Sequence, residues 1–380
     1  MAKGGNASIV RPLDYRVKKT TPPAPVFQPK RILFSITAGL LLCFLAGNPS
    51  FARPEHVIMI SCDGLRPDAV EFLGEKGAPH LHRLIKEGSY THNARTDANY
   101  TVTLPNHTCM LTGRGVNGES GHGWVSNSSP KIGEWLHRNK KAYLQSAFDV
   151  AHDHGLSTAL FASKNKFALY DFSYNERNGG PDTQGEDNGR DKINIYHLDG
   201  NTDPLIIKFI IAMHSQPFGF SMIHLRDCDS AGHGYGWNIA NGTPYMNAVA
   251  RADRQIGQLF TLIEVSNRLK GKTAMIVTAD HGGRLSTKTH TKADEPKNYT
   301  IPFYVWGPGV QAGGDLYKMN PGTRADPGKA NPPYDAKANP PVRNGDAGNL
   351  ATSLLGLPPI KGSTINGKQD LKVSVPAAEK

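Results

Sequence analysis

Short apolar runs alternate with longer stretches of helical periodicity along most of this chain. Runs of mainly apolar residues predict strands at positions 56–61, 157–162, 219–225, 273–278 and 301–306. Stretches with helical spacing predict helices at positions 79–87, 105–112, 132–138, 143–154, 204–214 and 245–269. Apolar strands separated by helices are typical of a mostly parallel sheet that is covered on both faces. The pattern therefore predicts an α/β fold.

Two long segments break this alternation, and the chain contains no evident internal repeat. Residues 175–192 are polar, and residues 315–341 are rich in Pro, Gly, Asn and Lys. Both compositions are typical of irregular structure. We expect two long loops at these positions.

Acidic residues follow three of the predicted strands directly. Asp63 comes after the first apolar run, Asp229 after the third and Asp280 after the fourth. In a parallel sheet ligands gather beyond the carboxyl ends of the strands, so these carboxylates can converge. An isolated Asp at a strand end is more often a turn or cap residue, and only the grouping favours a functional site.

Three histidines accompany these carboxylates. Asp229 and His233 have the i, i+4 spacing that puts two metal ligands on one helix face, although a capped helix with an exposed His fits equally well. Asp280 and His281 are adjacent ahead of two glycines, and neighbouring ligands that point apart could serve two metals. His290 lies in the polar stretch KTHTK, where a histidine is usually solvated.

Thr103 and Asn127 complete the candidate chemistry. Thr103 precedes Pro105 at an expected helix start, where it could cap the helix or present a hydroxyl at the positive end of the helix dipole. A metal-bound hydroxyl there could ionise and attack phosphorus or sulfur. Asn127 is either a turn residue or a donor to the transition-state oxygens. With Thr103 there are seven candidate ligands, which suits two metal sites better than one.

The composition is that of an ordinary globular protein, and the net charge changes the picture little. Of 380 residues, 20% are charged and 38% are hydrophobic. The formal charge of +10 includes +6 from residues 1–52, which leaves +4 for the rest. Because the basicity belongs largely to the N-terminal segment, specific binding to nucleic acid is not expected.

That N-terminal segment predicts export. Lys30 and Arg31 precede the apolar run ILFSITAGLLLCFLAG, and Ser50-Phe51-Ala52 offers a cleavage site. The run is shorter than the ~20 residues of a spanning helix, so residues 1–52 are interpreted as a signal peptide. An uncleaved anchor, the source of any membrane contact, is the alternative. We expect the mature protein to be periplasmic or secreted.

Cleavage would leave Cys62, Cys109 and Cys228, an odd number that excludes a full disulfide framework. Each of the three lies close to a candidate site residue in the sequence. They are interpreted as small buried residues packed under the site rather than as ligands, because Asp and His already supply the ligands.

Several motifs occur in one order along the chain: CDGLRPD, TVTLPNHTCMLTGR, GHGWVSN, DSAGHGYG, TADHGG, IPFYVWGPGV and LATSLLGLPPIKGSTIN. Together they resemble the type I phosphodiesterase/nucleotide pyrophosphatase family of the alkaline phosphatase superfamily. The resemblance implies an alkaline-phosphatase-like three-layer sandwich, with a central mostly parallel sheet flanked by helices. Residues 53–370 would form one catalytic domain, and residues 371–380 a tail.

The resemblance also implies roles for the site residues. It assigns Asp63, Thr103, Asp280 and His281 to one Zn²⁺, and Asp229, His233 and His290 to a second, although other divalent metals are possible. Thr103 would be the nucleophile and form a phosphothreonine intermediate, with Asn127 donating to a phosphate oxygen. The substrate would be a small phosphate ester.

The leaving group is left open by the sequence. Leu104 replaces the aromatic residue usual after the nucleophile in nucleotide pyrophosphatases, so a nucleotide base is not implied. Aromatic residues that could stack on a substrate, or instead anchor loops, are Tyr170, Phe172, Tyr235 and Trp237. A phosphomonoesterase or a phosphonate hydrolase remains an alternative. A sulfatase is disfavoured because Thr103 stands where Cys or Ser is expected, and a non-catalytic binding protein because every site residue is present.

Overall fold

The computed structural model describes residues 53–285 and 287–374 of the chain. They belong to one compact unit, residues 50–380, which includes the segment 53–370 predicted as the catalytic domain. The predicted signal peptide and most of the tail 371–380 lie outside the described residues. Within the described ranges no helix is both long enough and apolar enough to cross a membrane.

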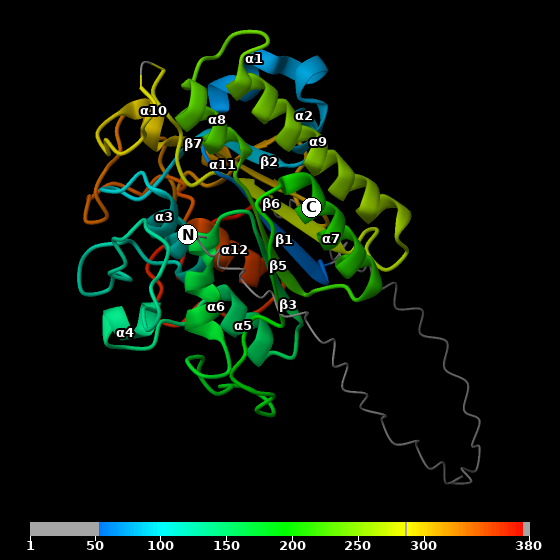
Figure 1. Ribbon diagram of the computed structural model, residues 1–380, viewed down its shortest axis with the longest axis vertical. Helices are drawn as coiled ribbons and strands as arrows, with labels where there is room; N and C mark the ends of the chain where they lie inside the picture. Colours follow the sequence, from blue (N-terminus) through cyan, green and yellow to red (C-terminus); the bar gives the residue numbers. More distant parts are fainter. Residues whose placement is uncertain (1–52, 286, 375–380) are drawn as a thin grey trace, which may run out of the picture. The chain divides into compact units, whose positions relative to one another are not determined.

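A single mixed sheet lies at the centre (Figure 1). Its strands in the described residues are β1 (His56–Cys62), β2 (Ser89–Arg95), β3 (Thr158–Ala162), β4 (Ile195–Leu198), β5 (Phe220–Leu225), β6 (Thr273–Thr278), β7 (Thr300–Trp306) and β8 (Gly314–Asp315). They are ordered β4-β3-β5-β1-β6-β7-β2-β8. Strand β7 runs antiparallel to both of its neighbours, and the other pairs are parallel. The predicted mostly parallel sheet is confirmed.

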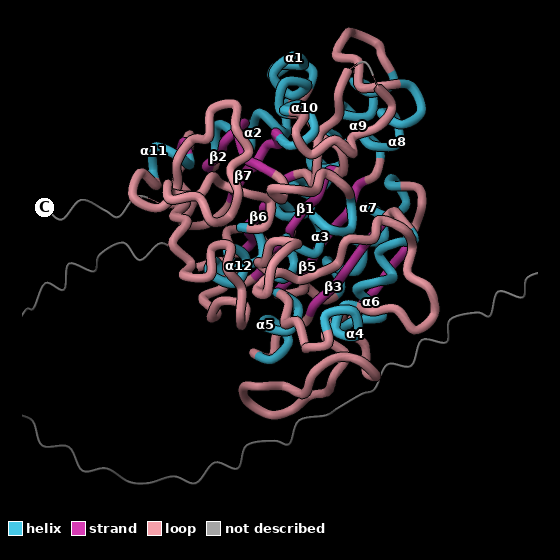
Figure 2. Tube along the Cα trace, turned by 90° about the vertical axis from the view of Figure 1, so that its left-hand side faces the viewer, coloured by secondary structure: helices cyan, strands magenta, loops and turns pink. Residues whose placement is uncertain are grey.

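Helices cover both faces of this sheet (Figures 1 and 2). On one side α1 (Pro67–Gly77), α2 (Pro79–Glu87) and α7 (Thr202–Ser215) pack against the long helix α9 (Pro244–Val265). On the other side α12 (Asp346–Leu354) packs against α3 (Thr103–Thr112) and α5 (Ala147–Asp153). The remaining helices of the described residues are α4 (Leu136–Lys140), α6 (Ala168–Tyr174), α8 (Asp227–Tyr235), α10 (Pro296–Tyr299) and α11 (Leu316–Met319). The three-layer arrangement matches the predicted fold class.

The apolar runs form the central strands because both faces of those strands are covered. All of β5 and β6, and β1 after His56, are buried, as a doubly covered parallel sheet requires. Helix α9 begins at Pro244, where the Thr243 side chain accepts a hydrogen bond from the backbone N–H of Met246.

Some predicted boundaries are wrong for identifiable reasons. The helix expected at 132–138 begins only at Leu136, and Ile132 lies exposed before it. The helix expected at 143–154 begins at Ala147, because Ser146 and Asp149 form a reciprocal capping box there. Strands β2, β4 and β8 escaped prediction, since β2 is rich in polar residues and β4 and β8 have only four and two residues.

The segment 175–192 is irregular, as predicted, and a buried lysine ties it to α5. Lys192 Nζ lies 3.1 Å from Asp153 Oδ1, contacts the Asp182 carboxylate and donates to the Gly189 carbonyl at 2.9 Å. His152 lies next to the same carboxylate of Asp182, at 3.2 Å. The ammonium of Lys192 therefore supplies positive charge to the carboxylates of Asp153 and Asp182.

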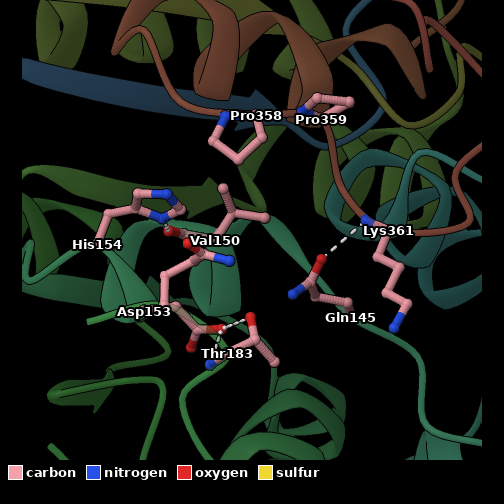
Figure 3. A pocket seen from close by; sticks show the side chains of 9 residues that line it. Gln145, Val150, Asp153, His154, Thr183, Pro358, Pro359 and Lys361 are labelled. Atoms are coloured by element: carbon pink, nitrogen blue, oxygen red, sulfur yellow. Dashed lines mark hydrogen bonds between the residues drawn. The ribbon is translucent and has the colours of Figure 1, made fainter. Parts of the chain in front are cut away.

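A pocket of about 360 Å³ opens beside this ion cluster (Figure 3). Figure 3 shows Asp153 and Thr183 on one side, joined by a hydrogen bond, and Pro358 and Pro359 on the other. The pocket contains none of the Asp and His residues that the sequence marks as candidate ligands. It lies along the segment that leads into β3, whereas those ligands follow the ends of other strands.

We predict that Lys192→Met lowers the free energy of unfolding by ~3 kcal/mol, because it leaves buried carboxylates without their cation. Burial alone would raise the pKa of Asp182, but Lys192 and the backbone N–H of Asn188 lower it to about 2. From an unfolded value of ~3.9, the pair's stabilisation is complete above pH ~4 and is lost as the pH falls through ~2.

Urea unfolding at pH 7 and at pH 3 measures this effect. The control is Lys208→Met, which removes an exposed ion pair with Asp199 and should cost less than ~1 kcal/mol. Equal losses in the two variants would contradict a structural role for Lys192.

Candidate metal centre

Four adjacent strands end at one edge of the sheet and deliver charged residues there. Strands β3, β5, β1 and β6 are neighbours in that order and run parallel. Lys164, Asp229, Asp63 and Asp280 follow their carboxyl ends. The sheet topology brings together residues that are more than two hundred positions apart in the sequence.

Asp63, Asp280 and His281 form the first of two ligand-like clusters at this edge of the sheet; a third such group in the described residues, His152, Asp153 and Asp182, is the one that Lys192 contacts. His281 Nε2 lies 3.3 Å from Asp63 Oδ1 and 3.4 Å from Asp280 Oδ2. The other oxygen of Asp280 accepts hydrogen bonds from the backbone N–H groups of Gly64 and His281. Asp280 and His281 thus face the same cluster rather than one cluster each.

Asp229, His233 and His290 form the second cluster. Helix α8 places His233 Nε2 3.2 Å from Asp229 Oδ1, as the i, i+4 spacing predicts. His290 Nε2 lies 3.4 Å from the same oxygen and 3.1 Å from His233 Nε2. Although its local sequence is polar, His290 is buried, and its ring stacks on that of His281 at 3.4 Å between centroids.

The three imidazoles share one orientation toward the clusters. Their Nδ1 atoms contact backbone carbonyls, at 2.7 Å in His233, 2.6 Å in His290 and 2.8 Å in His281. A carbonyl only accepts hydrogen bonds, so Nδ1 carries the proton. In the neutral ring Nε2 then offers its lone pair to the cluster, which is the tautomer that a metal ligand needs.

The residues present fit divalent cations. Among the described residues, Asp63 Oδ1, Asp229 Oδ1, Asp280 Oδ2 and His281 Nε2 are buried without a hydrogen-bond partner. Such atoms are costly unless a cation satisfies them. The separations between donor atoms also match the edge of ~3.3 Å of a tetrahedron with bonds of ~2.0 Å. Carboxylate and imidazole donors suit zinc among other divalent metals.

Thr103 is the first residue of α3. Contacts made by residues of this segment connect the start of the helix to both clusters. The carbonyl of Thr101 accepts the proton of His290 Nδ1, and the Thr101 hydroxyl donates to the carbonyl of His290. His107 Nδ1 donates to the Thr103 carbonyl at 2.8 Å and lies 3.6 Å from Asp280 Oδ2. Thr103 is buried, and it lies inside the helix, because the N-cap position is occupied by Val102.

Asn127 lies at the start of the same helix. Its Oδ1 accepts from the backbone N–H of Leu104 at 3.0 Å and from Lys166 Nζ at 3.2 Å. With the oxygen engaged, the Asn127 side-chain NH₂ is the group that remains for an incoming oxygen. The helix start, Asn127 and Lys166 together favour an anion at this position.

Sequence reasoning missed two residues that contact Asp63. Lys164 Nζ lies 2.5 Å from Asp63 Oδ2 and 2.6 Å from Asp229 Oδ2, so one ammonium bridges the two clusters. His224 Nε2 donates to Asp63 Oδ2 at 2.8 Å. Neither residue has a distinctive local pattern. The sequence offered one indication for Lys164, which is its position just after β3, where the ends of the parallel strands converge.

These contacts shift the pKa values of Asp63 and Asp280 in opposite directions. Burial alone would raise the pKa of Asp63, but Lys164 and His224 outweigh it and hold that pKa well below its usual range. Burial and the neighbouring charge of Asp63 raise the pKa of Asp280 well above its usual range. One lysine is thus too little positive charge for three buried carboxylates, which is the deficit that divalent cations would fill.

The four candidate stacking residues lie in different environments. Tyr170 and Trp237 are fully buried, and Tyr170 bonds to the main chain of α3, so neither offers a ring face to a substrate. Phe172 is half-buried, and Tyr235 is exposed at the end of α8. The three cysteines of the described residues are free and buried, which agrees with a packing role.

We predict that Lys164→Met increases the affinity of the metal-free protein for Zn²⁺ at least about tenfold. The ammonium and the metal compete for Asp63 and Asp229, and like charges ~4 Å apart repel by several kcal/mol near a protein surface. Competition titration with a chromophoric chelator measures the change. Lys166→Met is the matched control, because its ammonium contacts Asn127 and no carboxylate oxygen. Unchanged affinity in Lys164→Met would contradict this competition.

An eight-stranded mostly parallel sheet with paired Asp/His clusters at its carboxyl edge defines an alkaline-phosphatase-like α/β protein. Residues 57–299, well over half of the chain, match the family model of type I phosphodiesterase / nucleotide pyrophosphatase. The chain belongs to this family, and the resemblance seen in its motifs is confirmed.

Curated relatives match over limited lengths. Bis(5'-adenosyl)-triphosphatase ENPP4 of Bos taurus is 36% identical over 100 residues, 26% of this chain and 20% of the relative. GPI ethanolamine phosphate transferase 1 of Homo sapiens is 23% identical over 271 residues, 67% of this chain and 26% of the relative. The matches therefore span about a quarter or less of these relatives.

Solved structures share the fold. Murine ectonucleotide pyrophosphatase / phosphodiesterase 5, as an inactive variant in complex with AMP, superposes with a TM-score of 0.54 at 15% identity. That match covers 83% of this chain and 99% of the other. BT1596, a 2-O GAG sulfatase, also gives 0.54, at 12% identity, over 85% of this chain and 75% of its own. Similarity at this level shows the common fold alone.

Proposed function

We propose that this protein hydrolyses small phosphoric esters, as a phosphodiesterase of the nucleotide pyrophosphatase type, with Thr103 as nucleophile and two Zn²⁺ ions. One observation carries the proposal. Three histidines hold their Nδ1 atoms on backbone carbonyls and turn their Nε2 atoms toward buried carboxylates in two adjoining clusters, and the helix that begins at Thr103 is tied to both clusters. The basic and apolar pattern of the N-terminal segment supports a periplasmic or secreted location.

In this proposal Asp63, Asp280 and His281, with Thr103, hold one ion. Asp229, His233 and His290 hold the other. The bound ions supply Lewis-acid polarisation of the phosphoryl oxygens and favour the ionised hydroxyl. The carbonyl contacts of the three Nδ1 atoms keep the imidazoles in the ligating tautomer.

Thr103 and the start of α3 carry the covalent chemistry. The Thr103 oxygen attacks phosphorus in line, the P–O bond to the leaving group breaks, and the proton lost by the hydroxyl is balanced by the proton that the leaving alkoxide takes up to depart as an alcohol. Water then cleaves the phosphothreonine and restores the hydroxyl. The Asn127 NH₂ and the positive end of α3 would stabilise charge on the phosphoryl oxygens throughout.

Lys164 and Lys166 favour a second candidate function. This is hydrolysis of a phosphomonoester, or of a phosphonate that carries a further acidic group. With two divalent ions bound, Lys164 and Lys166 would bring the site to six positive charges against the three carboxylates. A diester offers one negative charge, whereas a monoester or a carboxylated phosphonate offers two or more. Charge balance at the site therefore supports substrates with the higher charge.

We predict that Thr103→Ala reduces turnover at least ~10³-fold while two zinc ions per chain are retained, because the nucleophile is lost and most ligands remain. Steady-state kinetics and elemental analysis test this together. Thr112→Ala on the same helix, which removes a hydroxyl bonded to the Thr108 carbonyl, is the control and should keep its activity. Loss of metal from Thr103→Ala would assign Thr103 a structural role instead.

A panel of esters separates the candidate functions in the zinc-loaded enzyme. Bis-p-nitrophenyl phosphate is expected to be cleaved with the highest kcat/KM. A preference for p-nitrophenyl phosphate would replace the diesterase proposal with the second candidate. A preference for a phenylphosphonate ester, which carries one negative charge as the diester does, would indicate a phosphonate hydrolase without the charge argument, and a preference for p-nitrophenyl sulfate, or no cleavage, would overturn both. Lys166→Met should reduce kcat/KM for the monoester more than for the diester, by about tenfold. An equal reduction for both esters would remove the electrostatic basis of the second candidate.

A further inference from the structure

Trp237, which the sequence left open as a substrate-stacking residue or a loop anchor, lies buried beneath the two clusters. It follows α8 and precedes α9, and its side chain is fully buried. Its carbonyl accepts from Arg66 Nη1 at 3.0 Å, and its ring packs against that of Tyr245 at 5.4 Å between centroids. Tyr245 in turn donates to the Gly64 carbonyl, next to Asp63. Contacts with Arg66 and Tyr245, which belong to neither cluster, therefore hold the indole in place.

Three glycines from three separate motifs make room for this one indole. A Cβ atom would lie 2.0 Å from Trp237 at Gly283, 2.4 Å at Gly232 and 2.9 Å at Gly64. Each glycine is within two residues of a candidate ligand, His281, His233 or Asp63. Gly64 also has a φ of +79°, but Gly232 and Gly283 need no left-handed backbone. At those two positions the three atoms nearest to an added Cβ all belong to the indole, which accounts for glycine there.

The indole also reaches all three histidines of the clusters. The ring centroids of His290, His281 and His233 lie 6.0, 6.2 and 6.3 Å from that of Trp237. Each pair is edge-to-face, with interplanar angles of 81°, 76° and 65°. The carbonyl contacts set the tautomer of each imidazole, but a single hydrogen bond leaves the ring free to tilt. Packing against one rigid indole removes that freedom.

We propose that Trp237 is a positioning residue that fixes the planes of His233, His281 and His290, and thereby sets the divalent-metal affinity of both clusters. The inference rests on the proposed function, in that it takes the clusters as metal sites. A substitution at Trp237 removes no ligand, so its effect passes through the orientation of the rings.

Trp237→Leu and Trp237→Phe test the inference. Zn²⁺ affinity, measured by chelator competition, is expected to fall ~10- to 100-fold in Trp237→Leu, the range found when groups that orient metal ligands are removed. Trp237→Phe keeps an aromatic edge and should recover part of the loss. With Co²⁺ in place of zinc, the visible d–d absorption of Trp237→Leu should change shape, because that spectrum reports the geometry of the ligands.

Phe148→Leu is the matched control. Phe148 is a buried aromatic residue of α5 that packs on Phe220 at the opposite, amino-terminal end of β5. It should lose stability as Trp237→Leu does but keep the metal affinity and the cobalt spectrum of the unaltered protein. Equal affinity losses in the two leucine variants would mean that general loosening of the core is responsible, and would overturn the inference.

A double-mutant cycle gives a second, independent readout if Trp237→Leu folds poorly. Gly283→Ala should weaken metal binding in the unaltered protein by displacing the indole, and should cost less when combined with Trp237→Phe. Additive effects would contradict the inference. If the protein binds two metal ions but cleaves no ester, the proposed function fails and the positioning role stands. If the unaltered protein binds no divalent metal, both fail.

Discussion

Three carboxylates buried at one edge of a sheet are the constraint on which the rest of this structure depends. Asp63, Asp229 and Asp280 are each nearly or fully buried within one site. Charges removed from water are tolerated only when opposite charges and hydrogen bonds compensate them. Lys164, His224 and backbone N–H groups supply part of this compensation. The oxygens left without partners define where further positive charge belongs.

The parallel topology makes this concentration of charge possible. Adjacent parallel strands point their carboxyl ends the same way, so every strand-end residue along β3, β5, β1 and β6 reaches one edge. Helix α8 then places His233 one turn after Asp229, and α3 brings its N-terminus to the same place. The apolar strands and their covering helices serve as a rigid frame that keeps these charged groups together.

The sequence reveals residues with periodic or local signals and conceals those whose role depends on distant partners. Apolar runs identified the central strands, and the i, i+4 spacing placed Asp229 and His233 on one face of α8. Lys164 and His224 could not be found in this way, because their partner Asp63 is about 100 and 161 residues away. For the same reason the sequence left the role of Trp237 open between substrate stacking and loop anchoring. Its aromatic type suggests a stacking surface, whereas its burial comes from three glycines in other motifs.

The stacked rings of His281 and His290 couple the positions of side chains in the two clusters. One ring belongs to each cluster, and they lie 3.4 Å apart at an interplanar angle of 10°. Faces this close leave neither ring room to tilt by itself, so a change in the plane of one imidazole has to move the other. A substitution that displaces the ring of one cluster would therefore disturb the other cluster as well, and the two clusters could not be altered independently.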